Sequence, residues 1–497
     1  MTRIGYVGTD GRSLLAALDT SRATSERYSG NYHGVVVRGT PAMAPWAERL
    51  GWPVSFIPTA ANTMEDYART LIGAFAGGAL DLALIMPESL IFQGLVDRVA
   101  EAGHGDKIIG LDSRGAFIEA DKIAAKNLCR EAGIAVAPAW TEVDARDYQA
   151  VLSTCLAYLH DFGGAVLKYP YSAGGKGARI ILNSWEIRDV YTLLLADYKA
   201  DYTAHFGKKG PWPLLIEARM TGMEISFTIL VDKNGNHQIL PTAMDYPERF
   251  EGPPGIDNPI TGGMGSISPH PLESPALVAM AEETLAKPLI AAMAKRGILR
   301  PCVLYPGCFV SFADNFQPRD IRVCEINVRP GEPEFQPVVK RLRNLGPMVA
   351  AMAAGNLSEV APEVREDQIS ICIALVTGPG GPKQQKGYPW SLTKGEPLAV
   401  DFEYFDKKKI TIIPSAMDYA EGSFKSDGSR VAFLVANATL KAGQRRGHVA
   451  ETLRHRLLNA YDLGKIRVIP RENEAGNRLA LRRDIGLHYQ KAEQLAG

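Results

Sequence analysis

The sequence lacks the features that mark several large classes of protein. Its 497 residues carry 55 basic and 55 acidic side chains, so the basic excess of a nucleic-acid or anionic-membrane binder is missing. No apolar run approaches the roughly 20 residues that a membrane-spanning helix needs. The first eight residues predict a β-strand rather than a signal peptide. We therefore expect a cytoplasmic protein that binds neither nucleic acid nor membrane.

Cysteine is scarce and scattered. The six cysteines form no CxxC pair and no Cys/His spacing typical of a metal site. Single thiols of this kind fit a reducing compartment and argue against a disulfide framework.

What the chain does have is length and regular strand and helix patterns. A chain of 497 residues is too long for one hydrophobic core, so it predicts three or four domains. Up to about residue 118, short apolar strands alternate with amphipathic helices, which predicts a doubly wound parallel sheet. The predicted strands cover residues 4–7, 34–38, 54–57, 80–85 and 107–111. From residue 166 to about 355 the pattern changes to an α+β core, and a final region begins near residue 360.

A glycine-rich loop follows one predicted strand of the α+β core. The strand ends at Lys168, and the loop at residues 172–177 leads into a second strand. Glycines in such a loop let backbone N–H groups approach phosphate oxygens closely. The segment is no P-loop, because it lacks the early glycine and the Ser or Thr after the Gly-Lys pair. A plain glycine-rich hairpin remains the alternative.

Two acidic residues bracket a predicted turn further along the chain. Glu217 and Glu224 stand on either side of Thr221 and Gly222, between two apolar strands. A carboxylate in this place can accept hydrogen bonds from ribose hydroxyls, while the connecting backbone meets an adenine edge. An ordinary hairpin with exposed acids is the alternative.

A third segment predicts a metal site. Glu325 and Asn327 are two residues apart on a predicted strand, so they share a face and offer oxygen ligands suited to Mg²⁺. Arg329 continues that face and offers a bidentate fork for a carboxylate or phosphate. The alternatives are a solvated strand face and, for Arg329, an ion pair with Glu332 or Glu334.

Taken in this order, the segments resemble the ATP-grasp superfamily and, within it, the glycinamide ribonucleotide synthetase (phosphoribosylamine–glycine ligase) family or a close divergent relative. The resemblance runs from residue 1 to about residue 488. Its further marks are Asp-Lys-Ile-Ala-Ala-Lys at 121–126, Thr-Gly-Gly-Met-Gly-Ser-Ile-Ser-Pro at 261–269, Val-Leu-Tyr-Pro-Gly at 303–307, Gly-Glu-Pro-Glu at 331–334 and Leu-Arg-Arg-Asp-Ile-Gly at 481–486.

The resemblance implies a domain plan and a reaction. The plan is a Rossmann-like domain at 1–118, an ATP-grasp domain of two α+β subdomains at 119–358 with a mobile subdomain at about 140–217, a small C-terminal domain at 359–488, and a tail at 489–497. The implied reaction is ATP-dependent amide formation through an acyl phosphate, as in the ligation of glycine to phosphoribosylamine in purine biosynthesis. ATP and Mg²⁺, or Mn²⁺ in its place, are the implied cofactors. The implied partners are small-molecule substrates, and the implied state is a monomer or homodimer.

The resemblance also assigns roles to residues. Lys122 and Lys168 would contact the phosphates under the glycine-rich loop, Glu224 the ribose, and the Met220 backbone the adenine. Arg329 would bind the carboxylate substrate and Asp245 the attacking amine. The full candidate site comprises catalytic Arg329, Asp245 and Lys168; ATP-binding Lys122, Lys168, Ser172, Gly174, Gly175, Lys176, Gly177, Glu217, Met220 and Glu224; and metal-binding Glu325 and Asn327.

The chain departs from the family pattern mainly on the substrate side. Residues 245–249 read Asp-Tyr-Pro-Glu-Arg where the family has Asp-His-Lys-Arg, and 217–219 read Glu-Ala-Arg in place of Glu-Glu-aromatic. Ile260 replaces an Asn, residues 329–332 read Arg-Pro-Gly-Glu for Arg-Phe-Gly-Asp, and the first turn keeps only Gly-Arg at 11–12. A ligase with a different carboxylate or amine is therefore the alternative. A non-catalytic relative is a third, against which the intact ATP and metal positions argue.

Overall fold

The N-terminal part of the chain forms a five-stranded parallel sheet, in the order β3-β2-β1-β4-β5. The strands are β1 (Thr2–Gly8), β2 (Tyr32–Arg38), β3 (Ser55–Ile57), β4 (Leu82–Ile85) and β5 (Ile108–Ile109). The connecting helices are α1 (Gly11–Ser21), α2 (Met43–Arg49), α3 (Met64–Ala76), α4 (Glu88–Phe92) and α5 (Leu95–Val99). The central strands are buried on both faces, as in parallel sheets covered by helices. The predicted doubly wound sheet is confirmed.

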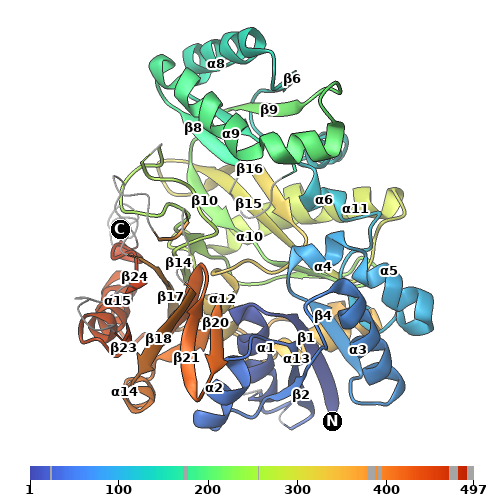
Figure 1. The fold of residues 1–497 in the computed structure, drawn as a ribbon, viewed down its shortest axis with the longest axis vertical. Helices are drawn as coiled ribbons and strands as arrows, with labels where there is room; N and C mark the ends of the chain where they lie inside the picture. The colour runs from blue at the N-terminus through green and yellow to red at the C-terminus, as the bar shows by residue number, and fades with distance from the viewer. Residues whose placement is uncertain are drawn as a thin grey trace.

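The computed structural model describes residues 1–22, 25–28, 30–171, 177–255, 257–378, 387–389, 394–469, 479–487 and 489. Figure 1 shows the parallel sheet at the lower right, below the middle of the molecule. Short 3-10 or π-helical segments lie at η1 (Ala100–His104), η2 (Ser184–Glu186), η3 (Glu282–Ala286) and η4 (Leu357–Glu359). Within the described ranges, no helix is long and apolar enough to cross a membrane. All six cysteines carry free thiols.

An upper subdomain stands at the top of Figure 1 and has its own core. Its antiparallel sheet has the order β6-β9-β7-β8. Helices α8 and α9 pack on this sheet. Helix α8 begins where Asp147 accepts a hydrogen bond from the Ala150 amide and ends at Gly163, which takes a left-handed conformation. The elements are β6 (Trp140–Asp144), α8 (Tyr148–Phe162), β7 (Ala165–Lys168), β8 (Ala178–Ile181), α9 (Ile187–Phe206) and β9 (Pro213–Ala218).

A central antiparallel sheet lies beneath the upper subdomain (Figure 1). It joins β10 (Met223–Ser226), β15 (Cys302–Phe312), β11 (Ile229–Val231) and β12 (His237–Ile239), with β16 (Pro318–Asn327) paired to β15. Helices α6 (Phe117–Ala120), α7 (Lys122–Glu131) and α10 (Pro275–Ala281) pack on β16, and α11 (Lys287–Lys295) packs on α7.

The turn at Thr221 and Gly222 connects two different sheets. Strand β9 belongs to the upper subdomain, whereas β10 pairs with β15 of the central sheet. The alternative of an ordinary hairpin at this turn is therefore wrong. Gly222 (φ 124°) lies so close to β15 that a Cβ atom would meet the Val310 carbonyl oxygen at 2.6 Å. Only glycine allows the chain to cross between the sheets along this path.

The C-terminal part shares a sheet with the preceding part. The sheet β13-β14-β17-β22-β19 joins β13 (Met244–Asp245) and β14 (Gly265–Ser268) to β17 (Gln368–Thr377), β22 (Arg430–Thr439) and β19 (Thr411–Pro414). Strand β24 (Leu479–Ala480) pairs with β17. One sheet thus contains strands from both sides of residue 358. Helices α12 (Phe335–Arg341) and α15 (Arg446–Asp462) pack on it, and α13 (Leu345–Ala354) packs on α1.

A second C-terminal sheet meets the N-terminal part through aromatic side chains. Its order is β20-β21-β18-β23, from β20 (Met417–Ala420), β21 (Ser423–Asp427), β18 (Lys394–Val400) and β23 (Ile466–Val468), with α14 (Phe402–Lys407) beside it. Trp46 of α2 is fully buried against Phe402 and Phe424, with ring centroids 4.7 and 4.9 Å away. Its indole N–H donates to the Ile412 carbonyl at 3.1 Å. The two ends of the chain therefore share one core.

Candidate active site

A cleft of about 390 Å³ lies between the upper subdomain and the central sheet. Strands β7, β8 and β9 line it from one side and β10, β15 and β16 from the other, and the segments 245–262 and 329–334 supply the rest. The cleft brings together most of the candidate residues. These are Lys168, Glu217, Met220, Glu224, Asp245, Glu325, Asn327 and Arg329. Lys122 lines a smaller adjoining cavity that shares Glu325 and Asn327 with the cleft.

The end of β16 carries the predicted metal-binding row. The Asn327 amide N–H donates to Glu325 Oε1 at 3.5 Å, and Arg329 Nη2 donates to Asn327 Oδ1 at 3.2 Å. The three side chains therefore lie in one row, as the alternation along a strand predicts. Opposite Glu325 on β15 stands Gly307, which presents no side chain to the cleft.

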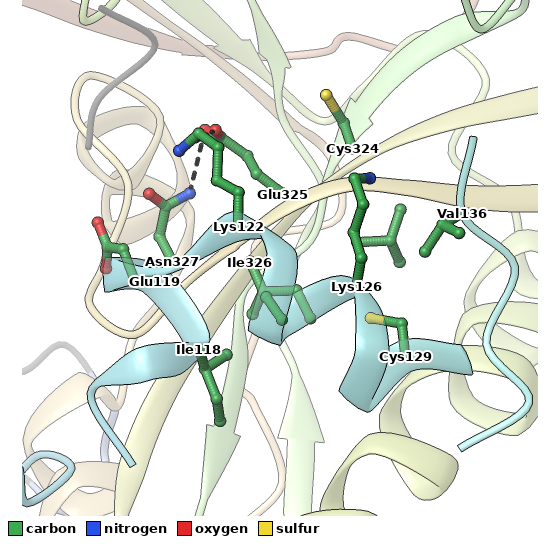
Figure 2. A pocket seen from close by; sticks show the side chains of 12 residues that line it. Ile118, Glu119, Lys122, Lys126, Cys129, Val136, Cys324, Glu325, Ile326 and Asn327 are labelled. Carbon is green, nitrogen blue, oxygen red and sulfur yellow. Dashed lines mark hydrogen bonds and ion pairs between the residues drawn. The ribbon is translucent and has the colours of Figure 1, made fainter. Parts of the chain in front are cut away.

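Lys122 lies beside the carboxylate of this row. Its Nζ is 3.7 Å from Glu325 Oε2, and Figure 2 shows Lys122 and Asn327 both directed at Glu325. Asp121 fixes the start of α7 by accepting hydrogen bonds from the Ile123 and Ala124 amides. Burial would raise the pKa of Glu325, but the charges of its cationic neighbours, Lys122 first among them, hold that pKa below its usual range. Glu325 is therefore an ionised carboxylate at neutral pH.

A buried ion triad lies next to the row. The carboxylate of Glu217, 1% exposed, pairs with Lys168 Nζ at 2.5 Å and also with Lys126. Burial, followed by the charge of Lys168, lowers the pKa of Lys126 to about 7. The sequence interpretation missed Lys126. It stands four residues after Lys122, so helical spacing alone could have placed both amines toward one side of α7.

Arg329 pairs with carboxylates that the sequence interpretation did not assign to it. Its Nε lies 3.2 Å from Glu88 Oε2 and 3.5 Å from Glu119 Oε1. The alternative of an ion pair with Glu332 or Glu334 is wrong, because the ion pairs of Arg329 among the described residues are those with Glu88 and Glu119, and Glu332 pairs with Arg430 at 2.8 Å. Glu88 and Glu119 lie more than 200 residues away in sequence, so no local pattern could reveal them. Burial opposes the charge of Arg329, but Glu119 and Glu88 raise its pKa.

Asp245 belongs to a group of acidic side chains that line the cleft. We call Asp245, Glu248 and Glu334 the acidic wall; all three line the cleft. Burial, then the charges of Glu334 and Glu224, raise the pKa of Asp245 well above its usual range. Burial, then the charges of Glu248 and Glu325, raise the pKa of the neighbouring Glu224 to about 8.

Two distant segments shape this wall. Gly263 (φ 92°) lets the Thr-Gly-Gly segment pass so close that a Cβ atom would lie 2.3 Å from Pro333 Cδ and 3.1 Å from Asp245 Oδ1. Arg482 donates to Glu248 Oε2 at 2.9 Å and is itself held by Asp484 at 2.6 Å. The Leu-Arg-Arg-Asp-Ile-Gly segment therefore reaches the cleft, which its position near residue 484 does not suggest.

The glycine-rich loop is covered only in part by the described residues. Ser172, Gly174, Gly175 and Lys176 lie outside them. Gly177 directly precedes β8, and its carbonyl accepts a hydrogen bond from the Tyr169 amide at 2.8 Å. The two flanking strands, β7 and β8, form the predicted antiparallel pair.

Comparison with known proteins shows which family the chain resembles. Residues 120–335 match the family model of the phosphoribosylglycinamide synthetase ATP-grasp (A) domain. The matched stretch is therefore similar to an ATP-grasp domain. The phosphoribosylamine–glycine ligase of Rhodopirellula baltica is 28% identical over 352 residues, which cover 70% of this chain and 74% of that protein. Over most of its length the chain is therefore similar to the phosphoribosylamine–glycine ligases.

Solved structures agree on the fold of the chain. The crystal structure of the phosphoribosylamine–glycine ligase of Thermotoga maritima has a TM-score of 0.68 at 21% identity and covers 97% of this chain and 100% of that one. The biotin carboxylase domain of 2-oxoglutarate carboxylase from Hydrogenobacter thermophilus, in complex with MgADP, has a TM-score of 0.56 at 16% identity, covering 92% and 89%. ATP-grasp enzymes use ATP with Mg²⁺.

The residues of the row suit a magnesium ion that is shared with a nucleotide. Glu325 offers a carboxylate and the adjoining Asn327 an amide oxygen, and both are ligands that Mg²⁺ accepts. Within the described residues, no group of three or more His, Cys, Asp or Glu side chains could hold a metal without other ligands. Such a sparse donor set fits Mg²⁺, which takes one or two protein ligands and completes its shell with phosphate oxygens and water.

Proposed function

We propose that the protein is an ATP-dependent ligase that joins a carboxylate to an amine through an acyl phosphate. The observation that supports this proposal is the row of Glu325, Asn327 and Arg329 facing Lys168 across one cleft. A carboxylate resists attack by an amine, so it must first gain a better leaving group. The row and the lysines provide metal ligands, a carboxylate-binding fork and phosphate-binding cations in one place.

In the first step, an oxygen of the substrate carboxylate attacks the γ-phosphorus of ATP. The bond between that phosphorus and the bridging oxygen breaks, and ADP leaves. Arg329 binds and orients the attacking carboxylate, while Lys122, Lys126 and Lys168 offset the negative charge of the phosphates. Mg²⁺, held by Glu325 and Asn327, would neutralise charge on the phosphate oxygens when it is bound. No protein nucleophile is needed.

In the second step, the amine nitrogen attacks the acyl carbon, and the bond from that carbon to the phosphate oxygen breaks. Inorganic phosphate leaves, and the nitrogen gives up a proton. Asp245 is our candidate to contact the attacking amine. Burial and the charges of Glu334 and Glu224 raise its pKa, so its ionised form is a stronger base than an ordinary carboxylate.

The names of the relatives point to glycine and phosphoribosylamine as the first substrates to test, and therefore to purine biosynthesis. A second candidate is a ligase that joins another carboxylate to another amine. Glu248 favours it, because this acid lines the cleft in the segment that reads Asp-Tyr-Pro-Glu-Arg here, whereas the resemblance leads us to expect Asp-His-Lys-Arg. Use of Mn²⁺ in place of Mg²⁺, a monomeric or homodimeric state and a cytoplasmic location are further parts of the proposal.

An ADP-release assay with paired substrates tests the proposal. Amino acids and other carboxylates are combined with a panel of amines, phosphoribosylamine included, in the presence of ATP and Mg²⁺. We expect ADP release that requires both an acid and an amine, with the amide detected by mass spectrometry. The alternative of a non-catalytic relative would be supported if the protein binds ATP but no pair gives ADP. ADP release that does not depend on the amine would contradict the proposed ligation.

A further inference from the structure

A chain of hydrogen-bonded side chains includes two members of the acidic wall. Asp245 is hydrogen-bonded to Glu334, and the Tyr305 hydroxyl is hydrogen-bonded to both Glu334 and Ser226. All four residues line the cleft. Ser226, Tyr305 and Glu334 are buried, whereas Asp245 is half-buried. Asp245 is therefore the member of the chain that is most open to a substrate, and Glu334 is the buried group that contacts it.

The backbone holds this hydrogen-bonded chain in place. A Cβ atom on Gly331 would lie 2.6 Å from Tyr305 Cζ and 2.7 Å from Glu334 Oε2. Both side chains therefore pack directly on the backbone at residue 331. The backbone at Gly263 bounds Asp245 in a similar way, since a Cβ atom there would lie 3.1 Å from Asp245 Oδ1. The positions of the two carboxyl groups are thus set by the backbone around them.

The electrostatic surroundings place one proton between the two carboxyl groups. Burial first, and then the charges of Glu334 and Glu224, raise the pKa of Asp245 well above its usual range. Asp245 is therefore protonated at neutral pH and donates a hydrogen bond to Glu334. The electrostatic field of Glu334 reaches the guanidinium groups of Arg329 and Arg430, so two cations offset its negative charge. The other ionisable side chains around the pair are Tyr246, Glu248, Tyr305, Glu332 and Cys372.

We propose that Glu334 is a positioning residue for the amine step, in which its carboxylate holds Asp245 toward the cleft and strengthens it as the proton acceptor. This inference rests on the proposed function, in which Asp245 contacts the amine. Once the nitrogen has bonded to the acyl carbon, one of its N–H bonds breaks. The bonding electrons stay on nitrogen, and the proton passes to the ionised Asp245 carboxylate. Asp245 then gives this proton to water in the cleft, while Glu334 stays hydrogen-bonded to Tyr305.

The charge of Glu334 has two opposing consequences for the amine step. It makes the ionised Asp245 a stronger base, which favours proton transfer from the amine. It also lowers the fraction of molecules in which Asp245 is ionised at a given pH. Removing this charge should therefore raise activity at low pH and lower it at high pH, whereas a residue with only a structural role would affect every pH alike.

The pH dependence of kcat/KM for the amine provides the first test. Methoxyamine serves as the amine because it stays neutral across the range, with ATP, Mg²⁺ and a carboxylate that supports ADP release, glycine first. For the unaltered protein, kcat/KM should rise with pH as Asp245 ionises. Glu334→Gln removes the charge and keeps the shape, so the rise should move at least about one pH unit lower and the plateau should fall about tenfold. An equal loss at every pH would overturn the proposal.

Two further variants complete this test. Glu396 in β18 is also 5% exposed but does not line the cleft, so the control Glu396→Gln should leave the position of the rise unchanged. Glu334→Asp withdraws the carboxylate by one methylene group and should move the rise in the same direction as Glu334→Gln, but less. If Glu334→Gln does not fold, an unchanged profile in Glu334→Asp would overturn the proposal.

Urea unfolding tests the carboxyl pair without relying on activity. Between about pH 5 and pH 9, the contribution of Asp245 to stability should fall as pH rises, because the folded state holds its proton more tightly than the unfolded state. Glu334→Gln should make this fall smaller, and its pH-dependent effect should largely vanish in the Asp245→Asn background. A pH-independent effect in both backgrounds would overturn the proposal. If the pH-dependent coupling is present but no acid–amine pair gives ADP, the carboxyl pair stands, whereas the ligase proposal and the role of Glu334 in it fail.

Discussion

The two sides of the cleft differ in how their charges are compensated. On the side of Lys168, each described cation has a carboxylate partner: Glu217 for Lys126 and Lys168, and Glu325 for Lys122. On the acidic wall, Asp245 and Glu334 have no such partner in the described residues. Under the proposed function, the first side receives ATP and the second receives the amine. The nucleotide side thus balances its charges through ion pairs, whereas the crowded carboxylates of the other side raise the pKa of Asp245 and of Glu224.

The largest expected effect comes from removing the carboxylate of the row. Glu325→Ala should lower kcat about 1,000-fold, because a metal ligand is lost and Lys122 loses its partner. Circular dichroism and the melting temperature should show an intact fold, as they should for the control Glu421→Ala, an exposed residue. Full activity in a well-folded variant would remove Glu325 from the site.

The next effect concerns the buried ion triad. Lys168→Met should weaken ATP binding about 10- to 100-fold and lower the free energy of unfolding by about 3 kcal/mol, because Glu217 is buried and loses one of its two partners. Calorimetry with ATP and urea unfolding measure the two quantities. The double variant Lys168→Met/Glu217→Gln should recover most of the stability but not the ATP affinity. Lys407→Met, at an exposed lysine, serves as the control.

The third prediction separates ATP from the carboxylate substrate. Arg329→Lys should raise KM for the carboxylate at least about tenfold more than KM for ATP, because a lysine cannot provide a bidentate fork. In this variant Glu88 and Glu119 also face the point charge of an ammonium group in place of the guanidinium. Steady-state kinetics with each substrate varied in turn give both constants. An equal loss for both substrates would contradict the assignment of Arg329.

The smallest effect is a pH dependence of stability on the side of the acidic wall. The pKa of Glu224 rises from 4.5 to about 8 on folding, so the folded state holds this proton more tightly. The contribution of Glu224 to stability therefore falls as pH rises from about 4.5 to about 8. Because the cleft is open to solvent, we expect a screened effect of about 1 kcal/mol. Urea unfolding of Glu224→Gln at pH 5, 7 and 9 should show a gain over the unaltered protein that grows with pH. If the difference in the free energy of unfolding between the two proteins stays constant with pH, the raised pKa of Glu224 is contradicted.

Local patterns predicted local structure well. The strands of the parallel sheet follow from apolar runs separated by amphipathic helices, and the row on β16 follows from the alternation of side chains along a strand. These inferences need only the spacing of residues within one element. Lys126 also belongs to this class, because its spacing from Lys122 is helical.

Patterns failed where distant segments meet. The sequence does not show which strand β10 pairs with, so the hairpin alternative could be rejected only from the structure. Glu88 and Glu119 approach Arg329 from another part of the fold, and Arg482 approaches Glu248 from 234 residues away. The charge state of the cleft depends on these long-range pairs, which is why the wall could not be recognised in advance.

The closure of the acidic wall by the C-terminal segment has a consequence for biosynthesis. Gly486 donates to the Tyr246 hydroxyl at 2.8 Å across 240 residues of chain, and Arg482 holds Glu248 in the same place. During synthesis, the residues of the nucleotide side therefore leave the ribosome long before Arg482 and Gly486, which complete the amine side. A nascent chain, or a chain cut before β24, would contain the lysines that we propose for ATP binding. It would lack the C-terminal residues that complete the amine side of the cleft. Under the proposed function, a complete C-terminal segment is thus a condition for coupling ATP cleavage to amide formation.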